Sequence, residues 1–520
     1  MIRFDQVSYA YPPADTQPVL RDISLTFKSG EEAVIMGGNG SGKTTLGLLL
    51  CGILKPQAGK ITIDGRRPGA SEDEMDNGPI IGFLFQDPDN GLVATTVERE
   101  VAFSLENRNQ PTEKIKSVVN RTLDLFGISD FRDRLVWHLS GGEKQRLSLA
   151  GLFASGPNIL FLDEPVSYLD FAGTGQLEKA LRTVKETDPN ITIIRVTQFP
   201  TLAENHDRAI IIGDGQILAD DSPHKIFPNR EIMNRAGLRP PLSYLTPRPI
   251  QLHSMPPANN EIKPEPVLKV EHLSFNYNFS NSAQLIDDIS LNINQGEVIA
   301  VVGSSGSGKS TLAQLICGIY KPTSGSISLG DARAVMSFQQ PEKQFFLDTA
   351  FDEIAFGVRQ DYDDDEALSA TVRRSMETAG LDFDTFRDRD PHSLSGGEAR
   401  RLAFAVVTAL KAELIIFDEP TCALDEPGLI SFKKLVARSI GAGKSVMIIT
   451  HNSDIIGDLA DRVVLLKDGK IGCSADPITF FENDQYKAIL PMPGVIRYQI
   501  NQSGRVVTSS AEAFFDLDEL

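Results

Sequence analysis

The sequence contains few cysteines and no long apolar runs. Four cysteines occur in 520 residues, none of them in a CxxC pair. So few thiols exclude a disulfide framework and indicate a reduced, cytosolic protein. No apolar run approaches the ~18–20 residues that cross a bilayer, so no direct membrane insertion is expected. The first residues, Met1–Asp5, lack the apolar core of a signal peptide.

Acidic residues outnumber basic residues in this chain. The chain has 51 Lys and Arg against 70 Asp and Glu, a formal net charge of −19. An acidic surface repels phosphate backbones and anionic lipid, so neither nucleic acid nor a bare membrane is expected as the main partner. The content of 41% hydrophobic and 23% charged residues is that of a soluble globular protein. At about 100–200 residues per domain, the length predicts two to four domains.

The sequence repeats itself. Gly-Lys-Thr at 42–44 recurs as Gly-Lys-Ser at 308–310. Leu-Ser-Gly-Gly-Glu at 139–143 recurs at 394–398. Motifs that recur in the same order indicate two domains of one kind.

A proline-rich segment separates the two copies. Residues 238–266 contain eight prolines, whose fixed φ and missing N–H donors favour an extended, semi-stiff linker. We therefore predict a first domain at 1–237 and a second at 267–485. The remaining residues, 486–520, form an extension for which the sequence indicates no role.

Each copy alternates short apolar runs with longer amphipathic stretches. Val, Ile and Leu cluster at 33–36, 159–162 and 191–196. Such runs are typical of buried parallel strands, and the amphipathic stretches between them of crossover helices. The pattern predicts an α/β fold.

A glycine-rich loop follows an apolar run in each copy and precedes a helical stretch. The spacing G-x-x-x-x-G-K-[ST] lets backbone N–H groups wrap a phosphate. The lysine neutralises the outer phosphates, the hydroxyl that follows it binds Mg²⁺, and the helix N-terminus adds its positive end. The predicted ATP-binding residues of the loops are Gly37, Gly38, Asn39, Gly40, Ser41, Gly42, Lys43, Thr44 and Thr45, and Gly303, Ser304, Ser305, Gly306, Ser307, Gly308, Lys309, Ser310 and Thr311.

Two acidic residues follow a second apolar run in each copy. The pairs are Asp163 with Glu164 and Asp418 with Glu419. An acidic strand end beside a phosphate loop is where an open α/β sheet binds ligands. The aspartates are predicted to hold Mg²⁺, together with Thr44 in the first copy. The glutamates are predicted to orient and deprotonate the attacking water.

Together these motifs resemble the nucleotide-binding domains of ABC-type ATPases over nearly the whole chain. The resemblance implies two P-loop NTPase cores, each with a small antiparallel β subdomain and a helical subdomain. It implies ATP and Mg²⁺ as cofactors and ATP hydrolysis as the activity. In that family the Ser-Gly-Gly signature of one cassette caps the γ-phosphate bound to the other. The matching residues are Ser140, Gly141 and Gly142, and Ser395, Gly396 and Gly397.

The resemblance also assigns roles to single side chains. It implies that Tyr11 and Tyr277 stack on adenine, although an aromatic side chain near a domain start is alternatively part of the core. It implies that Gln86 and Gln339 sense Mg²⁺ and the membrane partner. These two glutamines and Ser310 complete the predicted metal sites.

One position differs between the copies. The family keeps a histidine that contacts the γ-phosphate after the strand that follows the acidic pair. The second copy has His451 there, whereas the first has Gln198. Because an amide cannot carry a proton's charge near neutral pH, the second copy is expected to hydrolyse more ATP than the first.

Within the family, the chain resembles the ATPases of energy-coupling-factor importers. The similarity rests on residues 85–90 and 97–107, and on 338–344 and 352–357. It implies a transmembrane scaffold subunit, a separate substrate-binding membrane subunit, and a peripheral location on the cytoplasmic face of the cell membrane. The solute, a vitamin, its precursor or a metal ion, is not indicated by this chain.

The sequence fits two other functions less well. A soluble tandem cassette acting on ribosomes or DNA usually carries a long charged helical linker and a basic surface, unlike this proline-rich linker and acidic chain. An ATP-binding scaffold without turnover is disfavoured by the presence of Glu164, Glu419 and His451. An importer ATPase is the leading hypothesis.

Overall fold

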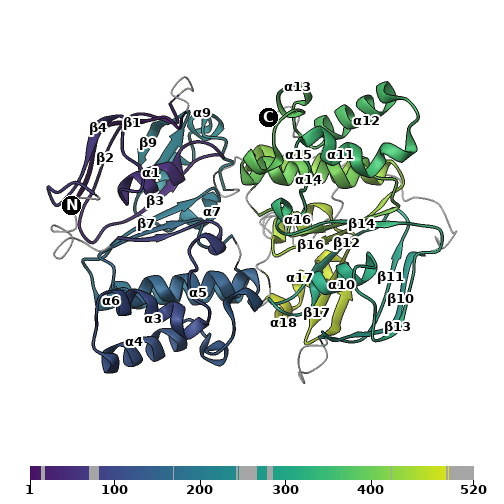
Figure 1. Ribbon diagram of the computed structural model, residues 1–520, viewed down its shortest axis with the longest axis horizontal. Helices are drawn as coiled ribbons and strands as arrows, with labels where there is room; N and C mark the ends of the chain where they lie inside the picture. The colour runs from purple at the N-terminus through teal and green to yellow at the C-terminus, as the bar shows by residue number, and fades with distance from the viewer. Residues whose placement is uncertain are drawn as a thin grey trace. The chain divides into compact units, whose positions relative to one another are not determined.

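The computed structural model describes residues 1–12, 18–68, 81–167, 169–241, 244, 266–277, 285–422, 424–487 and 490. The chain divides into two compact units, Met1–Thr246 and Pro247–Leu520 (Figure 1). Most of the predicted linker, 238–266, and most of the predicted extension, 486–520, lie outside the described residues.

The first unit is built on a six-stranded sheet. Its strand order is β5-β6-β7-β3-β8-β9, with only β9 antiparallel to its neighbour. Every residue of β6 and β8 is buried, because helices and a second sheet cover both faces. The strands are β3 (Glu32–Met36), β5 (Ile81–Leu84), β6 (Ile159–Asp163), β7 (Thr192–Thr197), β8 (Ala209–Gly213) and β9 (Gln216–Asp221).

A three-stranded antiparallel sheet, in the order β2-β1-β4, forms a smaller layer. Phe4 and Phe27 from this sheet share one apolar core with Leu46 and with Phe161 of the large sheet. This core fixes the small sheet against the first helix, α1. The elements are β1 (Ile2–Tyr9), β2 (Leu20–Phe27), β4 (Ala58–Ile63) and α1 (Lys43–Leu50).

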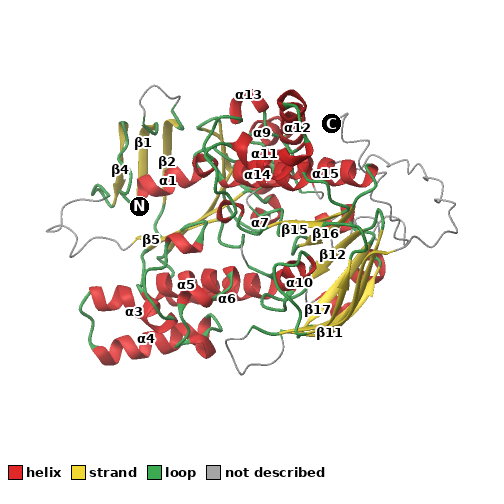
Figure 2. Cartoon of the chain, turned by 45° about the vertical axis from the view of Figure 1, so that its right-hand side comes forward, coloured by secondary structure: helices red, strands yellow, loops and turns green. Residues whose placement is uncertain are grey.

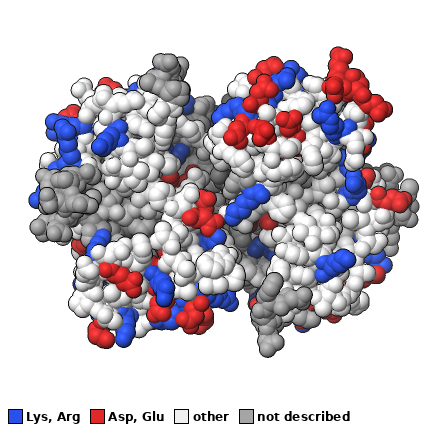
Figure 3. All heavy atoms as spheres, in the orientation of Figure 1, with Lys and Arg blue, Asp and Glu red and all other residues white. Residues whose placement is uncertain are grey.

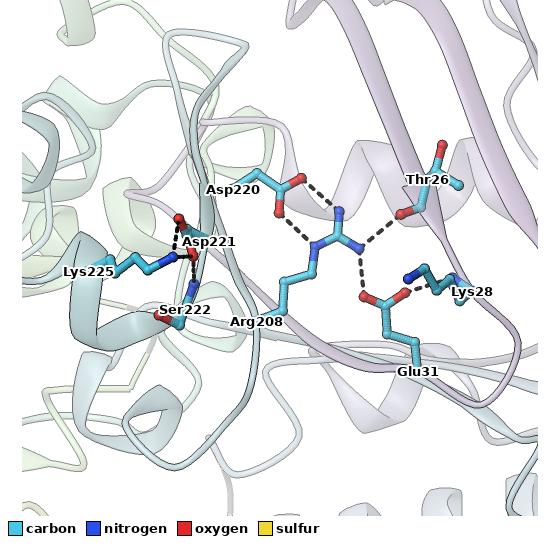
Figure 4. A network of polar contacts seen from close by, with 8 residues as sticks. All are labelled: Thr26, Lys28, Glu31, Arg208, Asp220, Asp221, Ser222 and Lys225. Carbon is cyan, nitrogen blue, oxygen red and sulfur yellow. Dashed lines mark hydrogen bonds and ion pairs between the residues drawn. The ribbon is translucent and has the colours of Figure 1, made fainter.

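Arg208, just before β8, ties the two sheets together (Figure 4). Its guanidinium donates to both carboxylate oxygens of Asp220 on β9, at 2.6 and 2.7 Å. It also donates to Glu31 Oε1 at 2.6 Å and to the carbonyl of Thr26 on β2 at 2.9 Å. Such charge-assisted forks are the geometrically specific contacts of an arginine.

A helical subdomain forms the remaining layer of the first unit (Figures 1 and 2). Val97, Val101 and Leu105 lie on one face of α3 and pack with Leu123 and Leu147 from the two neighbouring helices. Besides α1, the described helices of this unit are α3 (Val97–Asn107), α4 (Thr112–Leu125), α5 (Gly141–Ala154), α6 (Phe171–Thr187), α7 (Pro200–Ala203), α8 (Pro223–Ile226) and α9 (Arg230–Arg235).

The second unit repeats this arrangement. Its large sheet has the order β14-β15-β16-β12-β17-β18, and its small sheet the order β11-β10-β13. The strands are β10 (Pro266–Phe275), β11 (Ile286–Asn294), β12 (Val298–Val302), β13 (Ser324–Ser328), β14 (Ala334–Ser337), β15 (Leu414–Asp418), β16 (Ser445–Ile449), β17 (Arg462–Lys467) and β18 (Lys470–Ala475). The helices are α10 (Lys309–Ile316), α11 (Ala350–Val358), α12 (Asp365–Thr378), α13 (Phe383–Phe386), α14 (Gly396–Ala409), α15 (Glu426–Gly441), α16 (Ser453–Leu459), α17 (Pro477–Glu482) and α18 (Asp484–Lys487).

The structure confirms the predicted α/β fold, with a small antiparallel sheet and a helical subdomain in each unit. The predicted acidic strand ends are present as well: Asp163 is the last residue of β6, and Asp418 is the last residue of β15. Both aspartates are therefore fixed by the sheet itself. Within the described residues, no helix combines the length and apolarity needed to span a bilayer.

Candidate active sites

The loop before α1 has a shape that glycine alone supports. Gly42 has φ +99°, and a Cβ on it would lie 2.5 Å from the side chain of Leu20. Gly308 has the same φ, and its Cβ would lie 2.8 Å from Ile286. Left-handed φ and close neighbours both make a side chain unfavourable here. Each loop is thus held where its N–H groups can face a phosphate.

The lysine of each loop is buried. Lys43 Nζ donates to the carbonyl oxygens of Gly37 at 2.9 Å and Gly38 at 2.7 Å. Lys309 Nζ donates equivalently to two carbonyls of its own loop, at 2.8 and 2.9 Å. Each ammonium group therefore lies within its loop, as a phosphate-binding lysine must.

A hydroxyl and an aspartate meet beside each loop. Thr44 Oγ1 donates to Asp163 Oδ2 at 2.5 Å, and Ser310 hydrogen-bonds to Asp418 in the same way. Burial raises the pKa of both carboxyl groups, against the hydrogen bond from the hydroxyl and the charge of the lysine. Asp418 Oδ1 is buried and has no hydrogen-bond partner among the described residues. Paired hydroxyl and carboxylate oxygens are the hard ligands that Mg²⁺ prefers, so these residues fit the metal.

Glu164 follows β6 directly and is buried. Its Oε2 accepts hydrogen bonds from Ser167 Oγ at 2.9 Å and from Gln86 Nε2 at 3.3 Å. Burial raises its pKa to about 7, although the charge of Lys43 opposes the shift. The structure therefore brings the predicted base and the predicted metal-sensing glutamine of the first unit together.

Glu419 is the equivalent residue of the second unit. Its carboxylate accepts a hydrogen bond from the backbone N–H of His451 at 3.4 Å, and His451 Nε2 lies 3.3 Å from Oε1. Burial raises the pKa of Glu419 to about 8. A carboxyl group that titrates near neutral pH is suited to act as a general base.

Gln198 occupies the position of His451. Asp163 pairs with Val196 in the large sheet of the first unit, and Asp418 pairs with Ile449 in that of the second. Gln198 lies two positions after Val196, and His451 lies two positions after Ile449. The Gln198 side chain is 6% exposed, and neither its Nε2 nor its Oε1 has a hydrogen-bond partner among the described residues. The structure therefore confirms that the two residues are equivalent, while their roles in hydrolysis stay predictions.

Tyr11 and Tyr277 lie next to the phosphate loops. The Tyr11 hydroxyl is 3.2 Å from Thr45 Oγ1, and the Tyr277 hydroxyl is 3.1 Å from Thr311 Oγ1. The Tyr11 ring is well exposed, as stacking on a base requires, whereas Tyr277 also packs against the apolar core of its unit. Adenine stacking stays a prediction for both rings.

The signature motifs form the starts of α5 and α14. Ser140 caps α5 and Ser395 caps α14, each in a reciprocal capping box with the glutamate three residues later. The two glycines after each serine form the first helical turn, whose N–H groups suit an anion. Binding of a γ-phosphate there stays a prediction.

Two buried carboxylates were not identified from the sequence. Glu100 Oε2 on α3 accepts hydrogen bonds from the backbone N–H groups of Val93 at 2.9 Å and Ala94 at 2.6 Å. Glu353 on α11 binds the backbone of Phe346 and Leu347 equivalently. Recurrence of a glutamate at equivalent helix positions was the signal that could have revealed them.

These carboxylates hold segments that present apolar side chains. Phe346 and Phe356 are 63% and 65% exposed, and their rings meet edge to face at 5.2 Å. The equivalent Val93 and Phe103 are 64% and 44% exposed. Phe103 also lines a hollow of about 290 Å³ between β5, α3 and α5.

A comparison with known families assigns these features. The profile described as ABC transporter matches residues 20–167 and 286–422, more than half of the chain. The chain belongs to the ABC transporter family. It is an ATPase with two nucleotide-binding cassettes, the first in the unit Met1–Thr246 and the second in the unit Pro247–Leu520.

A curated relative agrees with this assignment. A protein of Caldanaerobacter subterraneus, provisionally named as an ABC transporter ATP-binding protein, is 30% identical over 89% of each chain. The cbiO1 structure from Clostridium perfringens, part of the ABC transporter complex cbiONQ, is 33% identical over 46% of this chain and 94% of its own, with a TM-score of 0.39. Archaeal ABCE1, bound to the ribosome with Pelota, has a TM-score of 0.67 at 20% identity over 91% of this chain and 79% of its own, a likeness of fold alone.

Proposed function

We propose that this ATPase energises a membrane importer of the energy-coupling-factor type. It binds, as a peripheral protein on the cytoplasmic face of the cell membrane, to a transmembrane scaffold subunit that works with a separate substrate-binding membrane subunit. The solute is a vitamin, its precursor or a metal ion. The carrying observation is the exposed apolar pair, Phe346 with Phe356.

Exposing these two phenylalanine side chains to water costs free energy. Each is more than three-fifths exposed, although burying a Phe side chain is worth about 1.5–3 kcal/mol. Exposed apolar patches mark contacts with other proteins. An amphipathic helix of the scaffold subunit fits such a surface, because apolar side chains at helical spacing cover a pair of rings.

The position of the pair supports a transport role. Phe346 lies seven residues after Gln339, in the segment that joins β14 to α11. A partner that moves this segment would move the predicted metal-sensing side chain as well. Relatives with transporter names and the net charge of −19 also favour a membrane protein partner over nucleic acid. In the face shown in Figure 3, carboxylates gather over α12 and α13.

The proposed chemistry follows from the second cassette. Lys309 neutralises charge on the outer phosphates of ATP. Glu419 orients the attacking water and takes its proton, while His451 lies at the same carboxylate and stabilises charge on the γ-phosphate. Ser310, Asp418 and Gln339 would hold Mg²⁺, which supplies positive charge to the phosphate oxygens when bound.

Co-purification from detergent-solubilised membranes tests the proposal. Phe346→Asp with Phe356→Asp in the full chain should reduce recovery of the transmembrane partner at least tenfold and leave binding of a non-hydrolysable ATP analogue by the purified chain within twofold. Ile319→Asp is the matched control, because Ile319 is an exposed apolar residue of the same cassette, 49% exposed. Full recovery with the double variant, or salt-resistant co-sedimentation of the wild-type chain with ribosomes, would contradict the importer role.

A further inference from the structure

A buried arginine joins two functional segments of the second cassette. Arg400 lies on α14, five residues after the signature Ser395, and is 4% exposed. Its Nη1 donates a hydrogen bond to the carbonyl oxygen of Glu419. Its Nη2 donates to the carbonyl oxygen of Gln339 at 2.9 Å. One guanidinium thus links the backbone at the catalytic glutamate to the backbone at the metal-sensing glutamine.

The environment of Arg400 is unusual for a charged side chain. Among the described residues it forms no ion pair with a carboxylate, and its Nε has no hydrogen-bond partner. Burying a guanidinium costs free energy unless its donors are satisfied. A neutral residue would pack at lower cost, so the arginine contributes its two carbonyl contacts and its charge, which lowers the pKa of Asp418 and of Glu419 against the larger effect of burial.

The first cassette lacks this link. Gln145 lies five residues after Ser140 and is fully buried, so it occupies the same position on α5. Its Nε2 donates only to the carbonyl of Pro165, at 3.2 Å, and its Oε1 has no partner in the part of the chain that the structure describes. The shorter amide contacts one carbonyl where the planar guanidinium contacts two.

We propose that Arg400 is a positioning residue. It couples the position of Gln339 to the position of Glu419, so that hydrolysis in the second cassette depends on the segment 339–347. A displacement of that segment moves the guanidinium through its hydrogen bond to Gln339, and the same guanidinium is hydrogen-bonded to Glu419, the residue that activates water. The first cassette has no such coupling through Gln145. This inference rests on ATP hydrolysis and not on the importer role.

The test uses the full chain with Glu164→Gln, so that turnover reports mainly the second cassette. Arg400→Gln, which installs the first cassette's residue, should lower kcat about ten- to a hundredfold, the loss typical of hydrogen bonds from a charged donor. Binding of a non-hydrolysable ATP analogue should change less than threefold, since Arg400 contacts no loop lysine. Arg401→Gln, one residue along α14, is the matched control and should leave kcat unchanged.

Arg400→Lys distinguishes positioning from charge and from packing. Lysine keeps the charge and most of the volume but lacks the planar fork, so kcat should stay at least fivefold below that of the Arg400 chain. Backbone amides of residues 339–347 should exchange hydrogen at least threefold faster in this variant. The proposal is overturned if Arg400→Lys restores full kcat with unchanged exchange, or if both variants lose analogue binding as much as they lose kcat.

Discussion

His451 Nε2 lies 3.3 Å from Glu419 Oε1, so in the second cassette an imidazole stands beside the predicted base. In the first cassette the equivalent carboxylate, Glu164, is contacted by Gln86 and Ser167 instead. Gln198, in the place of His451, is buried with its amide unpartnered. An amide can donate and accept hydrogen bonds, but it cannot become charged near neutral pH. The two cassettes are therefore expected to bind ATP alike and hydrolyse it unequally.

Restoring the imidazole should restore turnover. In a Glu419→Gln background, Gln198→His should raise the ATPase rate at least threefold, because the side chain enters a buried position equivalent to that of His451. Steady-state phosphate release measures the effect. Gln198→Asn, which keeps an amide, is the control and should give no increase. An unchanged rate with Gln198→His would mean that the amide does not limit the first site.

The phosphate loop of the second cassette should tolerate a methyl group at Gly306 far better than at Gly308. A Cβ on Gly308 would meet Ile286 at 2.8 Å and the carbonyl of Leu285 at 3.1 Å, whereas a Cβ on Gly306 would have no neighbour within 4 Å. Both glycines have positive φ, so both alanine variants carry backbone strain of about 1–3 kcal/mol. Gly308→Ala should therefore weaken ATP-analogue binding to the second cassette at least tenfold more than Gly306→Ala. Equal losses, measured by calorimetry, would contradict the described packing of the loop.

Glu32 should stabilise the first cassette in a pH-dependent way. A hydrogen bond from His206 and the charge of Arg195, 2.7 Å away, lower its pKa from 4.5 to about 2 against the effect of burial. The folded state thus keeps the carboxylate charged where the unfolded chain would protonate it. The stabilisation is complete above about pH 5 and is lost between about pH 4.5 and pH 2.

Glu32→Gln should accordingly lower the free energy of unfolding by about 1–2 kcal/mol at pH 7, and by progressively less below pH 4.5. Hydrogen exchange of the backbone amides of β7 and β8 in denaturant measures unfolding of the first cassette. Asp221→Asn, which removes the exposed pair with Lys225 seen in Figure 4, is the control and should have no measurable effect. A loss that stays constant from pH 7 to pH 3.5 would rule out this role of Glu32.

The sequence predicts the parts of each site that lie in short motifs. Loop spacing fixes where Lys43 and Lys309 lie, and an apolar run ending in two acids fixes Asp163 and Asp418 at a strand end. It does not predict contacts that depend on tertiary packing. Arg400 contacts residues 19 and 61 positions away, and no pattern along the chain pairs them. Likewise, the sequence does not show that the buried amide of Gln198 lacks a hydrogen-bond partner among the described residues, because this depends on how β7 packs.

The most direct test of the account compares the ATPase rates of two single variants of the full chain. Glu419→Gln should lower kcat by about 10²-fold, towards the loss that follows removal of a general base. Glu164→Gln should retain more than half of the wild-type rate, and both variants should still bind ATP at two sites. Equal loss of kcat in the two variants would contradict the claim that the second cassette carries most of the hydrolysis.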